Sequence, residues 1–298
     1  MTARDTASTM RPAVSFVTAF APAKINLTLH VTGQRTDGYH LLDSLVVFAD
    51  IGDTITADHA DDLSLRVDGP NAAGVPTDAS NLMIKAARLL DAKRGAALTL
   101  TKNLPPASGI GGGSSDAAAT LRALSTLWKA DLPTAAQVLT LGADLPVCMN
   151  TTAQRLSGIG DLLAPVPNLP ACDILLVNPR AEVATPTVFA ALDHRAHPPM
   201  PDKLPIWPTA QALADWLATQ RNDLQEAAIS VLPVIEDVLT ALRETNCMFA
   251  RMSGSGATCF AIFPPDGHSA KLALAQIHAG RPEWWAAQGA ILTESRGI

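Results

Sequence analysis

One glycine- and serine-rich stretch in the first half of the chain most constrains its fold. Residues 105–119 read PPASGIGGGSSDAAA, with Gly109, Gly111, Gly112 and Gly113 inside five positions. Glycine permits positive φ and lets a ligand approach bare backbone. The helix predicted next begins with unpaired N–H groups and partial positive charge. These features predict a site for an anion such as a phosphate.

This glycine loop differs from two better-known phosphate-binding loops. GxxxxGK[ST] needs a lysine after its last glycine, whereas Ser114 follows Gly113, and GxGxxG would need a glycine at position 114. An ordinary glycine-rich turn, with Ser114 or Ser115 as the helix N-cap, is the alternative. A serine of the first turn could also offer its hydroxyl to a Mg²⁺ ion that accompanies the phosphates, and Ser115 is the predicted ligand.

Composition limits the partners of such a site. The chain has 298 residues, 48% of them hydrophobic, which predicts two domains or one large domain. Its formal net charge is −6, so neither nucleic acid nor an anionic membrane is an expected partner. An anionic ligand must then be held by local groups, which draws attention to Lys24, Lys102 and the glycine loop.

The N-terminal residues and the cysteines indicate a reduced, cytoplasmic protein. Residues 1–12 lack the apolar segment of a signal peptide and are predicted to be a disordered tail, and no apolar run approaches the length of a membrane span. Cys148, Cys172, Cys247 and Cys259 form no CxxC pair and have apolar neighbours, which favours buried thiols. The seven histidines show no metal-ligand spacing.

Strands and helices follow one another without a regular βαβ rhythm, which favours an α+β fold. In the first half we expect strands at 14–21, 25–31, 45–48, 53–57, 97–101, 147–149 and 155–159, and helices at 82–93 and after the glycine loop. In the second half we expect strands at 173–177, 248–252, 258–263 and 290–292, and helices at 210–220, 223–231, 234–244 and 268–279.

The proline distribution predicts a domain boundary and one irregular loop. Residues 161–170 contain three prolines and separate a predicted N-terminal domain at 13–165 from a C-terminal domain at 166–298. Residues 194–208 contain five prolines and cannot form a regular element.

Three further segments carry candidate chemistry. Lys24 interrupts an apolar strand in PAKINL at 22–27, where lysine most often faces solvent; a partly buried lysine aimed at a phosphate is the alternative. Asp144 in LGADLP at 141–146 is either a turn residue, as its position favours, or a carboxylate held at a strand end for catalysis. SGSG at 253–256 is either a hairpin turn or a backbone surface for a substrate phosphate.

These motifs resemble those of the GHMP kinase superfamily, named for galacto-, homoserine, mevalonate and phosphomevalonate kinases. PAKINL at 22–27, PPASGIGGGSSDAA at 105–118 and SGSGAT at 253–258 match its three motifs in order. The long first motif, APAKINLTLHVTGQRTDGYHLLDSL, with the triple glycine and LGADLPV, is most similar to the branch that acts on 4-diphosphocytidyl-2-C-methyl-D-erythritol. The resemblance runs from about residue 18 to the C-terminus.

The resemblance implies a two-domain α+β fold. Its N-terminal domain would be like domain 2 of ribosomal protein S5, its C-terminal domain ferredoxin-like, and ATP and substrate would meet between them. It implies phosphoryl transfer from ATP, with Mg²⁺, to the 2-hydroxyl of the cytidine diphosphate methylerythritol, a step of the non-mevalonate pathway to isoprenoid precursors. A monomer or weak homodimer is expected.

Residue roles also follow from the resemblance. Lys24 and Asp144 match the catalytic pair. The positions matching ATP contacts are Asn81, Leu82, Lys102, Pro106, Ala107, Ser108, Gly109, Ile110, Gly111, Gly112, Gly113, Ser114 and Ser115. Tyr39 and His40 match residues that hold the cytosine, with Phe189 on its other face. Asn26, Thr185 and Gly254, together with Asp144, match further substrate contacts.

Departures from the family pattern leave alternatives open. Ala107 and Ser108 stand where the family loop is often richer in glycine, Asp116 stands where asparagine is common, and 194–208 matches nothing in the family. A different acceptor, such as homoserine, mevalonate or a sugar, is the alternative within the superfamily. A non-catalytic RNA-binding module built on the S5-like half is the alternative outside it, and the acidic charge opposes that function.

Overall fold

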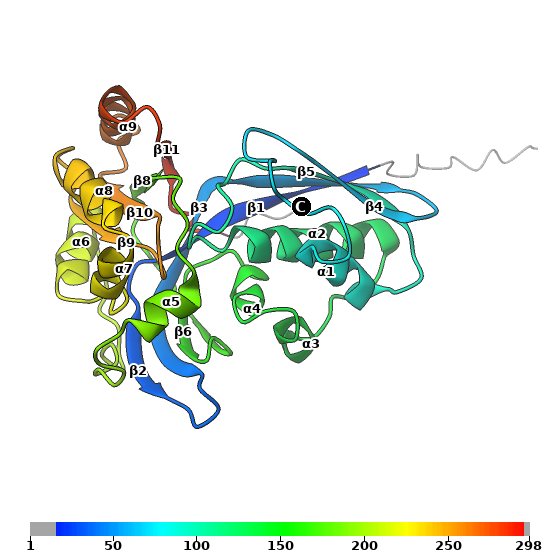
Figure 1. Ribbon diagram of the computed structural model, residues 1–298, viewed down its shortest axis with the longest axis horizontal. Helices are drawn as coiled ribbons and strands as arrows, with labels where there is room; N and C mark the ends of the chain where they lie inside the picture. The colour runs from blue at the N-terminus through cyan, green and yellow to red at the C-terminus, as the bar shows by residue number, and fades with distance from the viewer. Residues whose placement is uncertain (1–15, 295–298) are drawn as a thin grey trace, which may run out of the picture.

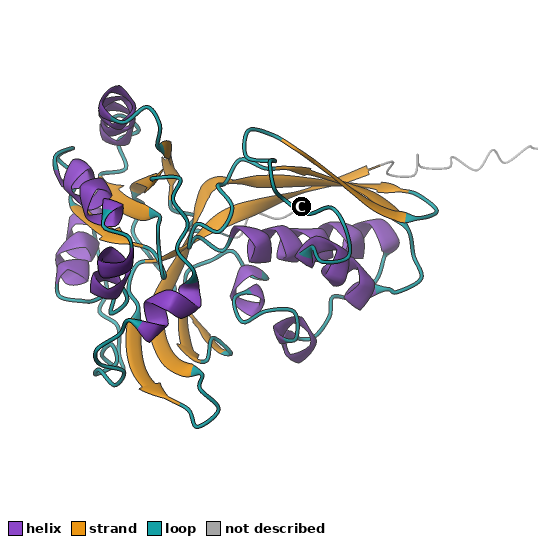
Figure 2. Ribbon diagram, viewed as in Figure 1, coloured by secondary structure: helices purple, strands orange, loops and turns teal. Residues whose placement is uncertain are grey.

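The computed structural model describes residues 16–294 as two β-sheets with helices packed around them (Figures 1 and 2). The tail predicted at residues 1–12 lies outside the described residues. The first sheet contains β1 (Phe16–Asn26), β2 (His30–Gln34), β3 (His40–His59), β4 (Leu63–Asp68), β5 (Ala96–Thr101), β6 (Gln154–Gly158) and β7 (Leu162–Pro165). The second contains β8 (Asp173–Asn178), β9 (Phe249–Met252), β10 (Cys259–Phe263) and β11 (Trp285–Ala290).

Nine helices connect or cover these strands within residues 16–294. Four belong to the first half: α1 (Leu82–Leu90), α2 (Gly112–Trp128), α3 (Ala135–Leu139) and α4 (Leu145–Cys148). Five belong to the second: α5 (Thr185–Ala190), α6 (Ala210–Ala218), α7 (Gln225–Val231), α8 (Val234–Arg243) and α9 (Ser269–Gly280).

The first sheet is built around β3, a strand of 20 residues. It pairs antiparallel with β1, β2, β5 and β6, while β4 pairs with β5 and β7 pairs with β6. The separate strands expected at 45–48 and 53–57 are therefore parts of one strand, because β1 continues to pair with β3 beyond Gly52. Pairing with a distant strand overrides the break that polar residues make in the local pattern.

Helices α1 and α2 lie along one face of this sheet (Figure 1). As predicted, Asn81 caps α1, where its side chain accepts a hydrogen bond from Met83 N at 2.8 Å. The predicted stripe of α2 is also buried: Leu121 and Leu124 are fully enclosed, and Trp128 is 6% exposed. Burial of this face keeps the start of α2 fixed relative to the sheet.

The second sheet is covered on both of its faces. Leu175 and Val177 of β8 pack in a core with α7, α8 and α9. Leu176 of β8 and Phe260 of β10 pack on the other side, in a core that includes Ile25 of β1. The two sheets thus share a hydrophobic core, and β10, which is buried along its whole length, consists only of apolar residues.

After β11 the chain returns to the first sheet. Ile291 forms a β-bridge with Ala49 of β3, and Leu292 N donates to Phe48 O at 2.7 Å. This return links the end of the described chain to the middle of β3. The domain division at 13–165 and 166–298 stays a prediction.

Three further predicted strands differ from the structure. The strand expected at 25–31 is divided, because β1 ends at Asn26 and β2 begins at His30. Residues 147–149 belong to α4 and its C-cap, and the strand expected at 290–292 is β11, which ends at Ala290. Pro146 occupies the first turn of α4, where a proline needs no N–H partner. A short apolar run does not distinguish a strand from a buried helical turn, so periodicity failed there.

No helix within residues 16–294 is long and apolar enough to cross a bilayer. The same residues contain no group of three His, Cys, Asp or Glu side chains placed to hold a metal ion. All four cysteines are free; Cys148, Cys172 and Cys259 are buried, as expected, whereas Cys247 is half-buried.

The shared core predicts a large loss of stability on truncation of Phe260, which is fully buried between the sheets. We expect Phe260→Ala to lower the free energy of unfolding by about 3–5 kcal/mol. Phe16→Ala, at a ring that is 54% exposed, is the matched control and should change it by less than about 1 kcal/mol. Urea unfolding measures both, and equal losses would contradict a shared core at this ring.

Candidate active site

The glycine loop is held between the first and third sequence motifs. Lys24 N, on β1, donates to Ile110 O at 2.9 Å. On the other side Thr258 N donates to Ser108 O at 3.2 Å, from the turn at 253–258 that joins β9 to β10. Three segments that are distant in sequence therefore form one continuous surface, and the hairpin turn predicted for 253–256 is present.

Two glycines of the loop are required by its geometry. Gly109 has φ 76° and Gly111 has φ 64°. A Cβ at Gly109 would lie 2.3 Å from the carbonyl oxygen of Gly256, closer than real side chains come. Gly111 itself is the N-cap of α2 and no side chain caps that helix, so neither Ser114 nor Ser115 has the predicted capping role. Free backbone N–H groups at this helix start favour an anion.

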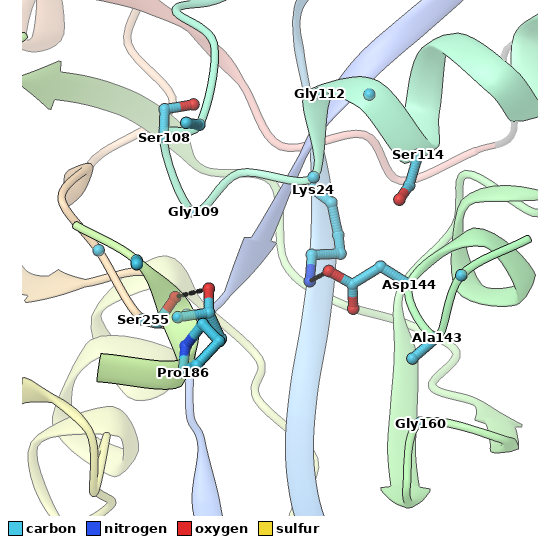
Figure 3. Close-up of a pocket in the computed structure, with 18 of the residues that line it drawn as sticks. Lys24, Ser108, Gly109, Gly112, Ser114, Ala143, Asp144, Gly160, Pro186 and Ser255 are labelled. Carbon is cyan, nitrogen blue, oxygen red and sulfur yellow. Dashed lines mark hydrogen bonds and ion pairs between the residues drawn. The ribbon is translucent and has the colours of Figure 1, made fainter. Parts of the chain in front are cut away.

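A cavity of about 1360 Å³ lies in front of the glycine loop (Figure 3). Its lining also includes residues 74–76 and 80–82, the segment before α4, the helix α5 and the turn at 254–256. Every residue predicted to contact ATP or substrate lines it, except Ile110 and Ser115, whose side chains are buried in the protein. The fold therefore brings almost the whole predicted set to one place.

Lys24 and Asp144 point toward one another across the floor of this cavity (Figure 3). Lys24 Nζ lies 3.0 Å from Asp144 Oδ2, and their side chains are 5% and 48% exposed. Lys24 is thus a buried lysine rather than a solvent-facing one, aimed into the cavity at a point where the β1–β3 register shifts. Asp144 precedes α4 as its N-cap instead of ending a strand, which corrects that detail of the prediction.

The two serines at the start of α2 face different surroundings. The Ser115 hydroxyl is buried and donates to Cys148 Sγ at 3.5 Å. Ser114 lines the cavity with its hydroxyl directed toward the Lys24–Asp144 pair (Figure 3). Of the two, only Ser114 offers an oxygen to a bound ligand.

Behind the loop lies a buried cluster of three charged groups. Lys102 Nζ donates to Asp53 Oδ2 at 2.6 Å and to Asp116 Oδ2 at 2.7 Å, and all three side chains are at most 5% exposed. Asp53 Oδ1 also accepts from Asn103 N and Leu104 N. Lys102 touches the cavity, but its ammonium is already paired with two carboxylates.

One ammonium between two carboxylates leaves this cluster with an excess negative charge. Burial raises the pKa of Asp116 to about 8, against the attraction of Lys102 and with added repulsion from Asp53. Burial also disfavours the charge on Lys102, yet Asp116 and Asp53 raise the pKa of that amine. Asp116 Oδ1 is buried without a hydrogen-bond partner, which fits a carboxyl group that retains a proton.

A second group of residues lines the cavity away from the glycine loop. The His40 ring stacks on Phe189 of α5, with centroids 4.4 Å apart and planes at 22°. Tyr39 is 59% exposed beside them. Burial, and next the charge of Arg195, lower the pKa of His40, so its imidazole is neutral at pH 7. Flat rings and a neutral imidazole suit an uncharged heteroaromatic base.

The remaining predicted substrate residues, Asn26, Thr185 and Gly254, line the same cavity. Asn26 donates to Ser44 Oγ at 2.7 Å, and its Oδ1 is buried without a partner. The hydroxyls of Thr185 and Ser255 are 2.8 Å apart. A Cβ at Gly254 would lie 2.9 Å from Gly109 O, so this glycine is also needed for close approach.

Sequence reasoning gave no site role to several polar residues that line the cavity, among them Arg195 and Ser255. Ser255 lies within the SGSG segment and could have been included with Gly254. Arg195 lies in the proline-rich loop, and nothing in its sequence surroundings indicates a site.

Comparison with known proteins decides the family. The models for the GHMP kinase N-terminal domain and C-terminal domain match residues 81–165 and 208–279, which together make up half of the chain. The chain belongs to the GHMP kinase family. The resemblance and the α+β GHMP kinase fold predicted from sequence are thereby confirmed, and the family uses ATP as phosphoryl donor.

Individual GHMP kinases are similar over nearly the full chain. A curated 4-diphosphocytidyl-2-C-methyl-D-erythritol kinase from Ruegeria pomeroyi is 60% identical over 93% of this chain and 99% of its own length. A crystal structure of 4-(cytidine 5′-diphospho)-2C-methyl-D-erythritol kinase superposes with a TM-score of 0.73 at 30% identity, covering 92% and 98% of the two chains. L. major mevalonate kinase shares the fold at 15% identity, with a TM-score of 0.64 and coverage of 97% and 99%.

The contact between Gly109 and Gly256 predicts that Gly109→Ala impairs nucleotide binding. Alanine would be strained at φ 76° and would push against the Gly256 carbonyl, so the loop must shift. We expect the KM for ATP to rise by about tenfold or more, since roughly 1.4 kcal/mol of lost binding suffices for that change. Gly142 lines the same cavity, and a Cβ there would meet nothing within 4 Å, so the KM of Gly142→Ala for ATP should stay near the parent value.

The Asp116 cluster predicts a pH-dependent contribution to stability. Folding raises the pKa of Asp116 from 3.8 to about 8, so between these values the folded state binds more protons than the unfolded state. The contribution is present at low pH and is lost as the pH rises toward 8. Urea unfolding at pH 5 and pH 8 should show a decline in the parent that is smaller in Asp116→Asn. Equal declines in both proteins would mean that Asp116 holds no extra proton.

Proposed function

We propose that this chain transfers the terminal phosphoryl group of ATP to the 2-hydroxyl of 4-diphosphocytidyl-2-C-methyl-D-erythritol. The observation that carries the proposal is the Lys24–Asp144 pair, whose 3.0 Å contact lies beside the glycine loop in the same cavity as the His40–Phe189 stack. The 60% identity to the kinase from Ruegeria pomeroyi supports this choice of acceptor.

The cavity has room for two ligands. Its volume of about 1360 Å³ exceeds the roughly 300–1,000 Å³ typical of a site for one drug-sized molecule. We place the ATP phosphates on the glycine loop and the start of α2, with the adenosine toward Asn81 and Leu82. The cytosine then lies against Tyr39, His40 and Phe189, where stacking contributes on the order of 1–3 kcal/mol per base.

Asp144 is the group that accepts the proton in the transfer. The acceptor oxygen forms a bond to the γ-phosphorus as the bond to the bridging oxygen of ADP breaks, and the hydroxyl proton passes to the Asp144 carboxylate. Phosphoryl transfer depends mainly on positioning and charge stabilisation, so this carboxylate also orients the hydroxyl. Asp144 is half-exposed at the cavity and can meet the substrate without rearrangement.

Lys24 contributes a fixed positive charge beside the reacting oxygens. Its side chain is 5% exposed and packs over Gly111, whose Cβ would lie 3.0 Å from that of Lys24. A buried charge is screened less than one in water, so it acts more strongly on the charge that develops on the phosphoryl oxygens. The ammonium also keeps the Asp144 carboxylate in place.

We propose that Mg²⁺ accompanies the nucleotide and offsets the charge of its phosphates. The oxygen donor that fits this ion is the Ser114 hydroxyl, which borders the cavity next to the glycine loop (Figure 3). Ser115 was predicted for this role, but its hydroxyl is buried against Cys148. Ser114 therefore replaces it in the proposal.

A monomer or weak homodimer remains our proposal for the assembly. Apart from Tyr39, which lines the cavity, the most exposed large apolar side chains in residues 16–294 are Ile206 in the proline-rich loop, Leu162 in β7 and Leu272 in α9. Scattered apolar residues are normal on a soluble surface and do not require a partner.

Asp144→Asn tests the proposed mechanism. Because asparagine cannot accept the proton, we expect kcat to fall by roughly 10²- to 10⁴-fold, while binding of an ATP analogue stays within about twofold. Asp61→Asn, at an exposed residue that does not line the cavity, is the control and should retain parent activity. A folded Asp144→Asn protein with the parent kcat would refute the role of Asp144.

Release of ADP with different acceptors tests the substrate assignment. At equal concentrations of acceptor, the cytidine diphosphate methylerythritol should give the highest kcat/KM, above mevalonate, homoserine and galactose. Turnover of mevalonate alone would contradict the proposed acceptor and leave the kinase assignment in place.

A further inference from the structure

The proline-rich loop at 194–208, to which sequence assigned no role, is hydrogen-bonded to the first sheet through residues 197–202. His197 N donates to Val31 O of β2 at 2.8 Å. Pro198 O accepts from Arg221 Nη2 at 2.8 Å. The loop thus follows β2, the strand next to the segment that carries Tyr39 and His40.

A second set of bonds fixes the middle of the loop. Asp43 of β3 accepts from Met200 N at 2.8 Å and forms a paired contact with Arg155 of β6 at 2.7 and 2.8 Å. Arg155 in turn donates to the backbone oxygens of Met200, Pro201 and Asp202 at 2.9–3.1 Å. Arg155 and Asp43 therefore clamp the loop onto the sheet by charge-assisted bonds.

The clamped loop presents Arg195 at the cavity. Arg195 lines the cavity with His40 and Phe189, and its Nη1 donates to Gln34 Oε1 at 3.3 Å. Its charge also acts on the His40 ring, since it contributes to the lowered pKa of that imidazole. Arg195 is therefore part of the acceptor side of the cavity, away from the glycine loop.

Arg195 is the cavity's uncommitted cation. The cavity lining contains two lysines and this arginine. Lys24 is paired with Asp144, and Lys102 is paired with Asp53 and Asp116. Arg195 has no carboxylate partner within residues 16–294; its side chain has only the weak contact with the Gln34 amide. A guanidinium in this state is available to an anion that enters the cavity.

We propose that Arg195 binds the diphosphate of the acceptor and is a specificity-determining residue for it. The inference rests on the proposed function, in which the acceptor is a cytidine diphosphate ester. The diphosphate joins the nucleoside to the alcohol, so it lies between the base at His40 and Phe189 and the reacting hydroxyl at Asp144. The planar guanidinium fork of Arg195 matches two phosphoryl oxygens.

This role separates the two phosphate-binding regions of the cavity. Backbone N–H groups and the start of α2 hold the phosphates of ATP, which every GHMP kinase must bind. Arg195 holds phosphates that only a nucleotide-linked acceptor brings. Replacement of Arg195 should therefore weaken binding of the acceptor without weakening binding of ATP.

The test compares Arg195→Gln with Lys203→Gln, an exposed residue of the same loop that does not line the cavity, so that both variants lose one positive charge. We expect Arg195→Gln to raise the KM for the acceptor about tenfold, as for loss of a charge-assisted hydrogen bond, with kcat and the KM for ATP within about twofold. Lys203→Gln should leave all three constants near the parent values. Arg195→Lys, which keeps the charge without the fork, should fall between parent and Arg195→Gln.

Inhibitors locate the contact within the acceptor. At saturating ATP, CDP should inhibit Arg195→Gln about tenfold more weakly than the parent, whereas uncharged cytidine should inhibit both proteins equally. The proposal would be overturned if Arg195→Gln weakened inhibition by cytidine as much as inhibition by CDP. It would also be overturned if Lys203→Gln raised the KM for the acceptor as much as Arg195→Gln does. A parent protein that does not turn over the cytidyl acceptor would instead refute the proposed function, and CDP binding measured by calorimetry in parent and Arg195→Gln would still test Arg195.

Discussion

The site depends on the backbone hydrogen bonds that hold the glycine loop between β1 and the 253–258 turn. Those bonds fix the loop against both sheets at once, and the loop in turn starts α2, whose buried face fixes it to the first sheet. An acidic chain cannot attract phosphates through its overall charge, so local N–H groups must hold them. The loop can pack against the 253–258 turn only because position 109 is glycine, since a side chain there would clash with the Gly256 carbonyl oxygen.

Charged side chains around the cavity are divided by their surroundings. The Lys24–Asp144 pair has one partner half-exposed, so its carboxylate can contact a substrate. The Lys102 cluster is enclosed, and the carboxylates of Asp53 and Asp116 satisfy its ammonium and leave an orphan oxygen. Both groups consist of lysine and aspartate, but they differ in burial. The half-exposed Asp144 carboxylate can contact a ligand, whereas the enclosed Lys102 cluster packs behind the glycine loop.

The proposed nucleotide and acceptor sides of the cavity differ in the groups that line them. The glycine loop, the start of α2 and the 253–258 turn present backbone atoms to the cavity, and their positive-φ glycines tolerate few substitutions. Such a surface suits a phosphate donor that is common to a family. The acceptor side consists of side chains on the β2–β3 segment, α5 and the proline-rich loop. L. major mevalonate kinase shares this fold at 15% identity, and a shared fold does not by itself fix which ligand a site takes.

The sequence by itself determined the positions where local chemistry leaves no choice: the glycine loop, the Asn81 cap of α1, the buried stripe of α2 and the hairpin at 253–256. Periodicity alone failed at 147–149, which is helical, and could not choose between a turn and a catalytic role for Asp144. Only the tertiary structure placed Lys24 against Asp144, buried Lys102 between two carboxylates and brought Arg195 to the cavity that His40 and Phe189 also line. Those contacts join residues far apart in the chain, so the tertiary packing of strands, helices and loops, and no local pattern, decides them.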